Sequence, residues 1–324
     1  MRAVICPVLE GPKSLRVQEL PEPKCGRGEV TIDVRAAGVN FPDVLLSYGK
    51  YQFKPAPPFV PGGEAAGVIT EVGEGVTRLK KGDRVATTML HGAFASRVVV
   101  PELSAVKVPD EVLFETAAAT LLTYLTTIHA LEDRAHLRAG ETLLVLGAAG
   151  GVGVAAIQLG KLLGAKVIAA ASSDAKIAFC IEQGADLGIV YSREDLKERA
   201  KALTSGQGVD VIYDAVGGTY SEAALRAIAW EGRHLVVGFA SGDIPRIPLN
   251  LALLKGCQIV GVFWGQFAMR DPARNLAHGE RIFGWVKEGK LSPHVDAVIP
   301  FDRAAEALER MERREVNGKL VLVP

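Results

Sequence analysis

The pattern of hydrophobic and polar residues changes about one third of the way along this chain of 324 residues. Up to about residue 110, apolar residues alternate with polar ones. In 29–36, for example, Val30, Ile32 and Val34 would lie on one face of a strand. Segments of the same texture follow at 67–72, 84–88 and 94–100, separated by turns that contain glycine. We therefore expect the first part of the chain to be rich in β-strands.

From about residue 115 the strand candidates are apolar throughout and alternate with helical patterns. An alanine-rich helical pattern covers 115–131, and the strand candidates after it are 142–146, 166–171, 187–190, 209–214, 233–238 and 258–263. Helical patterns lie between them, as in 154–163, 175–183, 195–203 and 221–229. Such an alternation predicts a parallel sheet covered by helices on both faces. Six strands predict one doubly wound α/β domain over 116–264.

The final segment, 265–324, returns to the mixed texture of the start. It contains helical patterns at 274–288 and 302–313 and strand patterns at 297–300 and 319–323. We expect this segment to rejoin the first part, which gives one domain built from 1–115 and 265–324. A chain of this length can bury two separate hydrophobic cores.

Composition and charge argue against several classes of function. The formal net charge is +0 and the pI is about 7.0, so we expect no nucleic-acid partner and no binding to acidic membranes. The start of the chain lacks a signal-peptide pattern, and no apolar stretch is long enough to span a membrane. The four cysteines are scattered along the chain: Cys6, Cys25, Cys180 and Cys257. They form no C-x-x-C pair and have no histidine at ligand spacing, so we expect neither disulfides nor a structural zinc site. We expect a cytoplasmic protein.

A cluster of glycines follows the first apolar strand of the α/β part. The strand Leu143 to Leu146 leads into Gly147, Gly150, Gly151 and Gly153, and a long apolar helical segment follows at once. Strand, glycine turn and helix in this order are typical of a dinucleotide site, because the backbone can approach a pyrophosphate and the helix N-terminus faces it. The first glycine of the usual pattern is Ala148 here. The alternative is a turn that only lets helix and sheet pack closely.

The end of the next strand, 166–171, indicates which dinucleotide is bound. An NAD site carries an acidic residue there, which holds the ribose 2′-hydroxyl. This chain instead has Ala171, Ser172 and Ser173, with Lys176 just after them. Missing negative charge beside a cation favours the 2′-phosphate of NADP(H).

Several short motifs in order resemble one enzyme family nearly end to end. They are 37–43, 61–67, 82–85, the glycine cluster, 214–218 and 317–319. Together they resemble the medium-chain dehydrogenase/reductase superfamily, in its zinc-free quinone oxidoreductase (zeta-crystallin-like) branch. The segments 229–242 and 263–265 resemble its quinone oxidoreductase-like subgroup. The resemblance implies a GroES-like, partly open β-barrel domain and a Rossmann domain with a doubly wound six-stranded parallel sheet, and an active site in the cleft between the two domains.

Departures from the zinc-dependent alcohol dehydrogenases of the superfamily bear on the chemistry. A cysteine stands in those relatives where this chain has Asn40, and a histidine where it has Gly63; the four-cysteine loop is missing as well. We therefore expect no metal. Without a Lewis acid, the favoured reaction is hydride transfer from NADPH to a quinone or an α,β-unsaturated carbonyl. Two alternatives remain open: a zinc-free alcohol dehydrogenase, and a non-catalytic, crystallin-like protein that binds NADPH.

The resemblance also implies the cofactor contacts. Gly150, Gly151, Val152 and Gly153 would hold the pyrophosphate, while Ser172, Ser173, Lys176, Tyr191 and Arg314 would approach the 2′-phosphate. Thr126 would lie near the nicotinamide, and the remaining lining residues are Val216, Phe239, Ala240, Phe263, Trp264 and Gly265. Plainer interpretations stay open for four of them. Lys176 could be a solvated lysine and Tyr191 an ordinary strand-end aromatic residue. Arg314 could belong to a basic helix end, and Thr126 could bond to its own helix backbone.

For the acceptor, Asn40, Asp43 and Tyr51 are the candidate catalytic residues. The Asn40 amide could bind a carbonyl oxygen, and Tyr51 matches a proton donor of related enoyl reductases. Asp43 could instead cap the helix after Pro42, and Tyr51 could be a pocket wall, with Tyr48 as its rival. Two further polar family positions are Leu45 and Ser47 here, which leaves the acceptor open and favours a more apolar mouth. We expect His91 and His129 to be structural.

The resemblance further implies a homodimer that joins the last strands of two Rossmann sheets. That edge would be 257–262, whose apolar residues fit a strand that becomes covered. The only other expected partner is the small-molecule acceptor.

Overall fold

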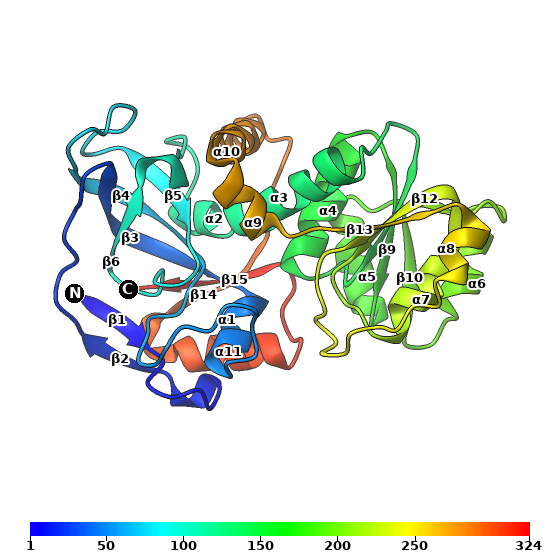
Figure 1. Ribbon diagram of the computed structural model, residues 1–324, viewed down its shortest axis with the longest axis horizontal. Helices are drawn as coiled ribbons and strands as arrows, with labels where there is room; N and C mark the ends of the chain where they lie inside the picture. Colours follow the sequence, from blue (N-terminus) through cyan, green and yellow to red (C-terminus); the bar gives the residue numbers. More distant parts are fainter. The chain divides into compact units, whose positions relative to one another are not determined.

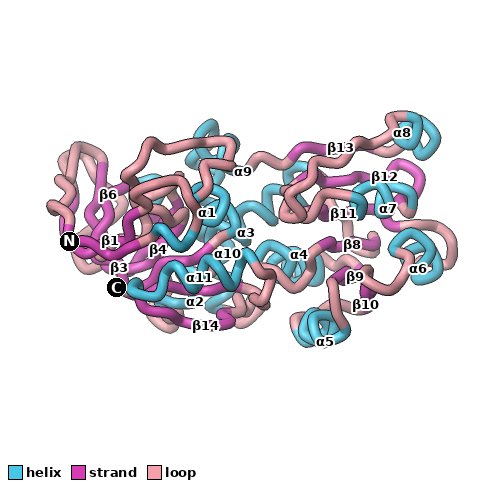
Figure 2. The backbone as a smooth tube through the Cα atoms, turned by 90° about the horizontal axis from the view of Figure 1, so that it is seen from below, coloured by secondary structure: helices cyan, strands magenta, loops and turns pink.

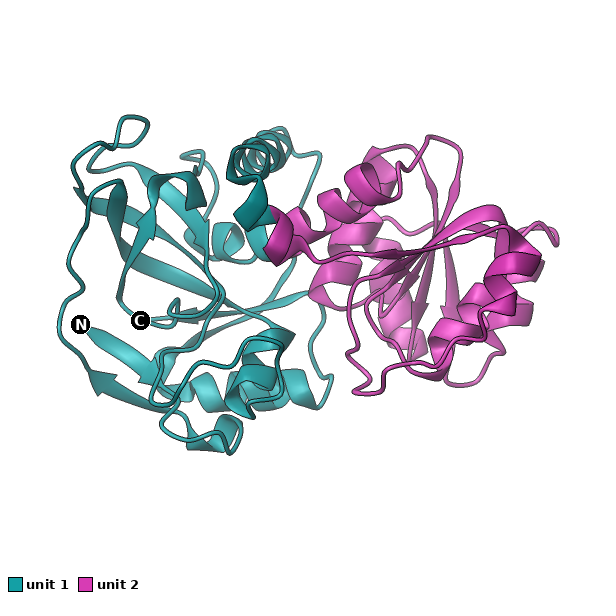
Figure 3. Cartoon of the chain, in the orientation of Figure 1, with its two compact units in different colours: residues 1–122, 268–324 teal, residues 123–267 magenta.

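The computed structural model describes all residues from Met1 to Pro324 and divides into two compact units. Unit 1 comprises Met1–Leu122 and Ala268–Pro324, and unit 2 comprises Thr123–Phe267 (Figure 3). Helix α2 (Phe114–Ala118) belongs to unit 1 because it packs against strands β3 (Glu29–Val39) and β4 (Glu64–Val72). The contact is tight: a Cβ added at Gly38 would lie 2.2 Å from the carbonyl oxygen of Ala118.

Unit 1 is built on a seven-stranded sheet. Its strands are β14 (Val295–Pro300), β15 (Lys319–Val323), β3, β4, β5 (Arg84–Thr88) and β7 (Ala105–Lys107) in spatial order, with β6 (Arg97–Pro101) on β3. A separate hairpin pairs β1 (Arg2–Ile5) with β2 (Arg16–Glu19). The pairing of β3 with β4 shifts register twice, which bends the sheet. Strand β15 lies antiparallel to β3, so the C-terminal segment returns to the first part of the chain (Figure 1).

The helices of unit 1 lie on this sheet and beside one another. They are α1 (Phe41–Ser47), α2, α10 (Pro272–Lys287) and α11 (Ala304–Glu312), with short 3-10 turns at Pro12–Ser14, Glu102–Ser104 and Phe301–Arg303. Helix α11 packs against α1. The core between these layers includes Ile32, Ile69, Phe94 and Phe301, none more than 1% exposed.

Unit 2 is a six-stranded parallel sheet. Its strands are β8 (Thr142–Leu146), β9 (Lys166–Ala171), β10 (Leu187–Val190), β11 (Val209–Asp214), β12 (Ile228–Val236) and β13 (Gln258–Gly261). They lie in the order β10-β9-β8-β11-β12-β13, which Figure 2 shows as a row. The first strand is therefore central and the order reverses beside it, as in a doubly wound dinucleotide-binding sheet. The predicted α/β sheet is confirmed.

The helices of unit 2 alternate with its strands along the chain. They are α3 (Leu121–Ile128), α4 (Gly151–Leu162), α5 (Asp174–Glu182), α6 (Leu196–Leu203), α7 (Thr219–Arg226), α8 (Asn250–Lys255) and α9 (Trp264–Arg270). Two of these helices, α3 and α9, cross the unit boundaries at their ends. No helix in the chain combines the length and apolarity needed to cross a lipid bilayer.

Two predicted helices have different bounds in the structure. The pattern 115–131 is not one helix, because α2 ends at Ala118, α3 follows it, and a π-helical turn covers His129–Arg134. Threonine hydroxyls bond back to carbonyls four residues earlier in this region, at Thr120 and Thr127, and such bonds compete with a regular helix. The pattern 221–229 ends early because β12 already begins at Ile228.

Candidate cofactor and acceptor sites

In the glycine turn between β8 and α4, a side chain has no room at Gly153 but has room at Gly150. Gly147 has a positive φ of 70°. A Cβ at Gly153 would lie 2.4 Å from the carbonyl oxygen of Gly147, so this glycine is required for the helix to start against the strand. At Gly150 the nearest atom would be 3.5 Å away, so packing alone does not require a glycine there.

Gly150 is also the N-cap residue of α4, and no side chain caps this helix. The N–H groups of its first turn, which includes Gly151 and Val152, are therefore left for a ligand. A bare helix N-terminus and a glycine without a packing role fit a pyrophosphate, because the backbone can come close and its N–H groups point at the anion.

Four of the residues predicted around the 2′-phosphate gather at the ends of β9 and β10. Ser173 caps α5, and its hydroxyl accepts a 3.3 Å hydrogen bond from the backbone N–H of Lys176. The Tyr191 N–H donates to the Ala171 carbonyl at 3.1 Å, which ties the two strand ends together. Ser172 lies in the same turn.

This strand-end cluster gains one cation that the sequence analysis missed. The hydroxyl of Ser192 donates to the Ser172 carbonyl at 2.8 Å, and the next residue, Arg193, pairs with Asp174 at 2.5 Å. The acidic residue of this turn, Asp174, is thus part of an exposed ion pair. Arg193 could have been noticed in the sequence as a basic residue two positions after Tyr191. Arg314 lies in unit 1, just beyond α11, with a positive φ of 59°.

A buried carboxylate organises the turn after β11. One oxygen of Asp214 accepts hydrogen bonds from the N–H groups of Val216 and Gly217, both at 2.9 Å. The other accepts from the Ser221 hydroxyl at 2.5 Å and lies 3.1 Å from Nε2 of His234. Burial by itself raises the pKa of Asp214, but the hydrogen bonds from His234, Gly217 and Ser221 together hold it below its usual value.

Backbone hydrogen bonds also join the turn after β11 to the loop after β12. The Ala240 N–H donates to the Ala215 carbonyl at 3.1 Å, and the Ser241 N–H donates to the Val216 carbonyl at 2.8 Å. These bonds hold the ends of β11 and β12 together. The residues predicted there to line the cofactor, among them Val216 and Phe239, therefore lie near one another in unit 2. Phe263, which is 58% exposed, Trp264 and Gly265 follow the end of β13, and the partly buried Thr126 lies on α3.

Two of the candidate catalytic residues meet where β3 passes into α1. The backbone N–H of Asn40 donates to a carboxylate oxygen of Asp43 at 2.8 Å, so Asp43 does cap the start of this helix. Asp43 is only 1% exposed. Burial raises its pKa to about 7, although the N–H groups of Asn40 and Gly62 and the charge of Lys319 act in the opposite direction. Asp43 is therefore both a capping group and a group that titrates near neutral pH.

The side-chain amide of Asn40 is fully engaged within the protein. Its nitrogen donates to Oε1 of Glu64 at 2.9 Å and to the Gly38 carbonyl at 3.3 Å. Its oxygen accepts a 2.6 Å hydrogen bond from Nζ of Lys319. Both amide hydrogens are used, so this amide cannot donate to an acceptor molecule while these bonds persist.

Lys319 and Glu64 both bond to the side chain of Asn40, and neither is among the site residues predicted from the sequence. Nζ of Lys319 lies 2.6 Å from Oε1 of Glu64, and their side chains are 4% and 1% exposed. The signal was a lysine at the start of an otherwise apolar terminal strand and a glutamate among small apolar residues. Charged residues are almost never fully buried unless paired.

The two candidate tyrosines have different surroundings. Tyr51 packs against the buried Cys6, Leu46 and Phe59, and burial followed by the charge of Asp43 raises its pKa. The pKa of Tyr48 is raised chiefly by a hydrogen bond with Glu312, on α11. Of the two tyrosines, only Tyr51 has a pKa that the charge of Asp43 raises.

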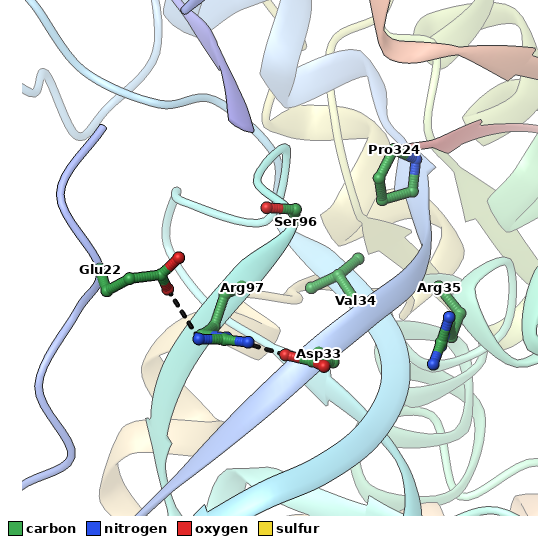
Figure 4. A pocket seen from close by; sticks show the side chains of 7 residues that line it. All are labelled: Glu22, Asp33, Val34, Arg35, Ser96, Arg97 and Pro324. Carbon is green, nitrogen blue, oxygen red and sulfur yellow. Dashed lines mark hydrogen bonds and ion pairs between the residues drawn. The ribbon is translucent and has the colours of Figure 1, made fainter. Parts of the chain in front are cut away.

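Two histidines that we expected to be structural contact neighbouring side chains, and unit 1 also has a surface hollow. His91 stacks on Phe53 with ring centroids 5.9 Å apart, and Nδ1 of His129 lies 2.8 Å from Asp133. The hollow shown in Figure 4, of about 270 Å³, is lined by Glu22, Asp33, Val34, Arg35, Ser96, Arg97 and Pro324. Arg97 bridges Glu22 and Asp33 there. None of the predicted site residues lines it.

Comparison with known proteins places the chain in a family. The Alcohol dehydrogenase GroES-like domain matches residues 26–110, and Zinc-binding dehydrogenase matches residues 151–278. A quinone oxidoreductase-like protein 2 homolog of Nematostella vectensis is 40% identical over 324 residues, which cover 99% of this chain and 88% of the relative. The chain belongs to the medium-chain dehydrogenase/reductase superfamily, in its quinone oxidoreductase-like branch.

Solved structures of this superfamily share both domains. The Escherichia coli quinone oxidoreductase complexed with NADPH has a TM-score of 0.94 and 30% identity, with all of both chains covered. An NAD-dependent alcohol dehydrogenase has a TM-score of 0.90 and 33% identity, again with full coverage of both chains. The sheet of unit 1 is the predicted GroES-like domain, and the sheet of unit 2 is the predicted Rossmann domain.

Asn40 and Gly63, the two positions that the resemblance compares with zinc ligands, offer neither a thiolate nor an imidazole. No group of three or more His, Cys, Asp or Glu side chains in this chain is arranged to hold a metal ion. The cation that contacts Asn40 and Glu64 is the ammonium of Lys319.

Proposed function

We propose that this medium-chain dehydrogenase/reductase is an NADPH-dependent, zinc-independent reductase that transfers hydride to a quinone or an α,β-unsaturated carbonyl. The observation that carries the proposal is the strand-end cluster of Ser172, Ser173 and Lys176, which offers hydroxyls and a cation where an NAD site needs an acid. The NADPH complex of the similar Escherichia coli quinone oxidoreductase supports the same cofactor.

The cofactor residues divide by the part of NADPH that each would hold. The bare N-terminus of α4, with Gly150, Gly151, Val152 and Gly153, would take the pyrophosphate. Ser172, Ser173, Lys176, Tyr191 and Arg314 would take the 2′-phosphate. The nicotinamide and adenosine surfaces would be lined by Thr126, Val216, Phe239, Ala240, Phe263, Trp264 and Gly265. Bound NADPH supplies the hydride, and the protein supplies orientation and a dry pocket.

Tyr51 is the proposed proton donor to the acceptor. Hydride addition to an enone leaves negative charge on the carbon next to the carbonyl, and a phenol O–H can protonate it, which completes reduction of the double bond. Asp43 is buried close enough for its charge to raise the pKa of Tyr51. The role proposed for Asn40 is to shape the acceptor end, since its amide hydrogens are already bonded to Glu64 and Gly38.

The donor set at the acceptor end supports zinc independence. A divalent ion prefers thiolate, imidazole or carboxylate ligands, and here the carboxylate of Glu64 is paired with an ammonium at 2.6 Å. A metal bound to Glu64 would have to displace Lys319. This favours reduction of an activated double bond over oxidation of an alcohol, which needs a Lewis acid or a strong base.

A panel of acceptors tests the proposal. We expect the purified protein to oxidise NADPH, and NADH much more slowly, with 9,10-phenanthrenequinone or an enone as acceptor, and to do so equally well after treatment with a zinc chelator. Tight NADPH binding without turnover of any acceptor would favour the crystallin-like alternative. Reduction of NADP⁺ by simple alcohols would favour the alcohol dehydrogenase.

The proposed assembly is a homodimer through β13. This strand is one of the two edges of the sheet, and its Ile259 is 41% exposed. Exposed apolar side chains stand nearby in the sequence, with Leu249 at 78% and Leu253 at 79%. A second copy would cover such an edge. The four cysteines are free thiols, which fits the reducing cytoplasm that we propose as the compartment.

A further inference from the structure

The ammonium of Lys319 uses all of its hydrogens inside the protein. It donates to Oε1 of Glu64 at 2.6 Å, to Oδ1 of Asn40 at 2.6 Å and to the Val39 carbonyl at 2.9 Å. An ammonium has three hydrogens and no acceptor. Lys319 therefore has none left for an outside molecule, and its effect must pass through the groups that it holds.

Those groups lie at the point where the acceptor site begins. Val39 ends β3 and Asn40 is the N-cap residue of α1, the helix that contains Asp43. The backbone N–H of Asn40 is bonded to Asp43. Lys319 thus holds the strand-to-helix turn at two consecutive residues, one through its backbone carbonyl and the other through its side chain.

Glu64 completes the arrangement from the opposite side. One carboxylate oxygen receives both Lys319 and the Asn40 amide nitrogen, and the other accepts the backbone N–H of Leu122 at 2.9 Å, in the first turn of α3. A helix N-terminus stabilises such a carboxylate. The Asn40 amide then has a donor at its oxygen and an acceptor at its nitrogen, which permits only one of its two flipped orientations.

A gain in stability does not by itself explain why Lys319 and Glu64 form a buried ion pair. Removing two charges from water is costly, and replacing a buried ion pair by neutral groups of similar size is often neutral or stabilising. An ion pair orients polar neighbours in a way that neutral apolar groups cannot. The neighbour oriented here is Asn40.

We propose that Lys319 is a positioning residue of the acceptor site, which fixes the Asn40 amide in one orientation and with it the turn that presents Asp43. The inference rests on the proposed reductase function, since it assigns a role within that reaction. Lys319 and Glu64 act on the acceptor through hydrogen bonds to Asn40, not through contact with the acceptor.

Three variants separate positioning from stability: Lys319→Met, Glu64→Gln, and both together. Each single variant leaves one buried charge without its partner and is expected to lower the melting temperature. The double variant carries neither charge and is expected to melt above both single variants. It still lacks the donor to Asn40 Oδ1, so its kcat for the quinone or enone should stay at least about tenfold below wild type, with the Kd for NADPH unchanged. Recovery of wild-type kcat together with stability would overturn the proposal.

A measurement on the unmutated protein decides the point if the double variant does not fold. The chain has four asparagines, Asn40, Asn250, Asn275 and Asn317, so ¹⁵N-asparagine labelling gives four side-chain amide signals. Asn40→Ser identifies the signal of interest. We expect the Asn40 amide hydrogens to exchange with solvent at least about a hundredfold more slowly than those of the exposed Asn250. Equal exchange rates would show that the amide is not held.

These measurements also separate the inference from the function on which it rests. If the wild-type protein turns over no acceptor, the proposed reductase function fails, and the exchange rates still report whether the Asn40 amide is held in one orientation. If the wild-type protein is active and the double variant is equally active, only the positioning role fails.

Discussion

Nζ of Lys319 lies 2.6 Å from the side-chain oxygen of Asn40, a residue 279 positions earlier in the chain. The contact forms because β15 pairs with β3, which brings the last strand beside the end of the strand that leads to Asn40. The proposed acceptor end of the site is thus complete only when the C-terminal segment has joined the sheet of unit 1.

Lys176→Ala should weaken NADPH binding by about 1–3 kcal/mol, because a charge-assisted contact with the 2′-phosphate is lost. NADH lacks this phosphate, so its affinity should hardly change. Titration of both cofactors by fluorescence measures the two values. Lys166→Ala is the matched control, since Lys166 is exposed at the opposite end of β9. Equal losses for NADPH and NADH would remove Lys176 from the phosphate site.

Gly150→Ala and Gly153→Ala should separate cofactor binding from packing. At Gly153 a Cβ would lie 2.4 Å from the Gly147 carbonyl oxygen, so Gly153→Ala should lower the melting temperature. At Gly150 there is room in the fold, and φ is −81°, which alanine adopts freely. Gly150→Ala should therefore keep wild-type stability and weaken NADPH binding at least about tenfold by crowding the pyrophosphate. Unchanged affinity in this variant would contradict the pyrophosphate assignment.

Tyr51→Phe should slow enone reduction and leave NADPH affinity unchanged, because it removes the phenol proton but not the ring. A loss of about a hundredfold in kcat is expected for a general acid. Tyr48→Phe is the matched control: its hydroxyl interacts with Glu312 instead of Asp43, so kcat should stay near wild type. Steady-state rates at saturating NADPH give both numbers. If Tyr48→Phe is the slower variant, the two tyrosines have been assigned the wrong way round.

Asp43 should make the protein less stable as the pH rises from about 4 to 7. Its pKa is about 7 in the folded chain against an ordinary value of 3.8, so the folded state holds the proton more tightly. The stabilisation is fully present below the ordinary pKa and is lost as the pH rises through the folded one. Asp43→Asn keeps an oxygen for the Asn40 N–H but does not titrate. Its melting temperature relative to wild type should therefore increase between pH 5 and pH 8.

Asp186→Asn provides the opposite control for this pH dependence. Although burial raises the pKa of Asp186, hydrogen bonds from Lys161 and Val167 lower it overall. Its stabilisation is present above the ordinary pKa and is lost in acid. The melting temperature of Asp186→Asn should therefore lie below wild type at pH 7 and approach it as the pH falls. The same pH trend in both variants would rule out the raised pKa of Asp43 as the cause.

Ile259→Lys should break the proposed dimer. A lysine on a free strand edge opposes pairing with a second copy, and Ile259 is already 41% exposed, so the fold should tolerate the change. Light scattering coupled to gel filtration should report a dimer for wild type and a monomer for the variant. Ile181→Lys, at a 44% exposed position on α5, should remain dimeric. A wild-type monomer at micromolar concentration would contradict the assembly.

The α/β half of the fold could be predicted closely because its signals are local. The bounds of β8, β9, β10 and β11 agree with the apolar segments, since a strand buried on both faces is apolar throughout. The prediction of one helix over 115–131 was wrong because alanine favours helix without showing where it is interrupted. A side-chain bond back to the backbone, that of Thr120, lies at the break between α2 and α3, and the hydrophobic pattern does not show it.

The candidate site divides in the same way. Ser172, Ser173 and Lys176 could be found from the sequence because they are neighbours at one strand end. Arg193, Glu64 and Lys319 have only weak signals in the sequence, since each matters through a residue elsewhere in the chain. The rivalry between Tyr48 and Tyr51 also had to wait for the fold, because only the course of the loop decides which phenol is coupled to Asp43.

The sequence alone establishes the two hydrophobic patterns of the chain, the glycine turn, the strand end without an acid, and the residues at positions 40 and 63. These are properties of residues close together in the chain, where periodicity and spacing are visible. The tertiary structure decided that Lys319 holds Asn40, that the amide of Asn40 is already engaged, and that Asp43 titrates near neutral pH. Hydrogen-bond partners and burial depend on segments far apart in sequence, and only folding brings those together.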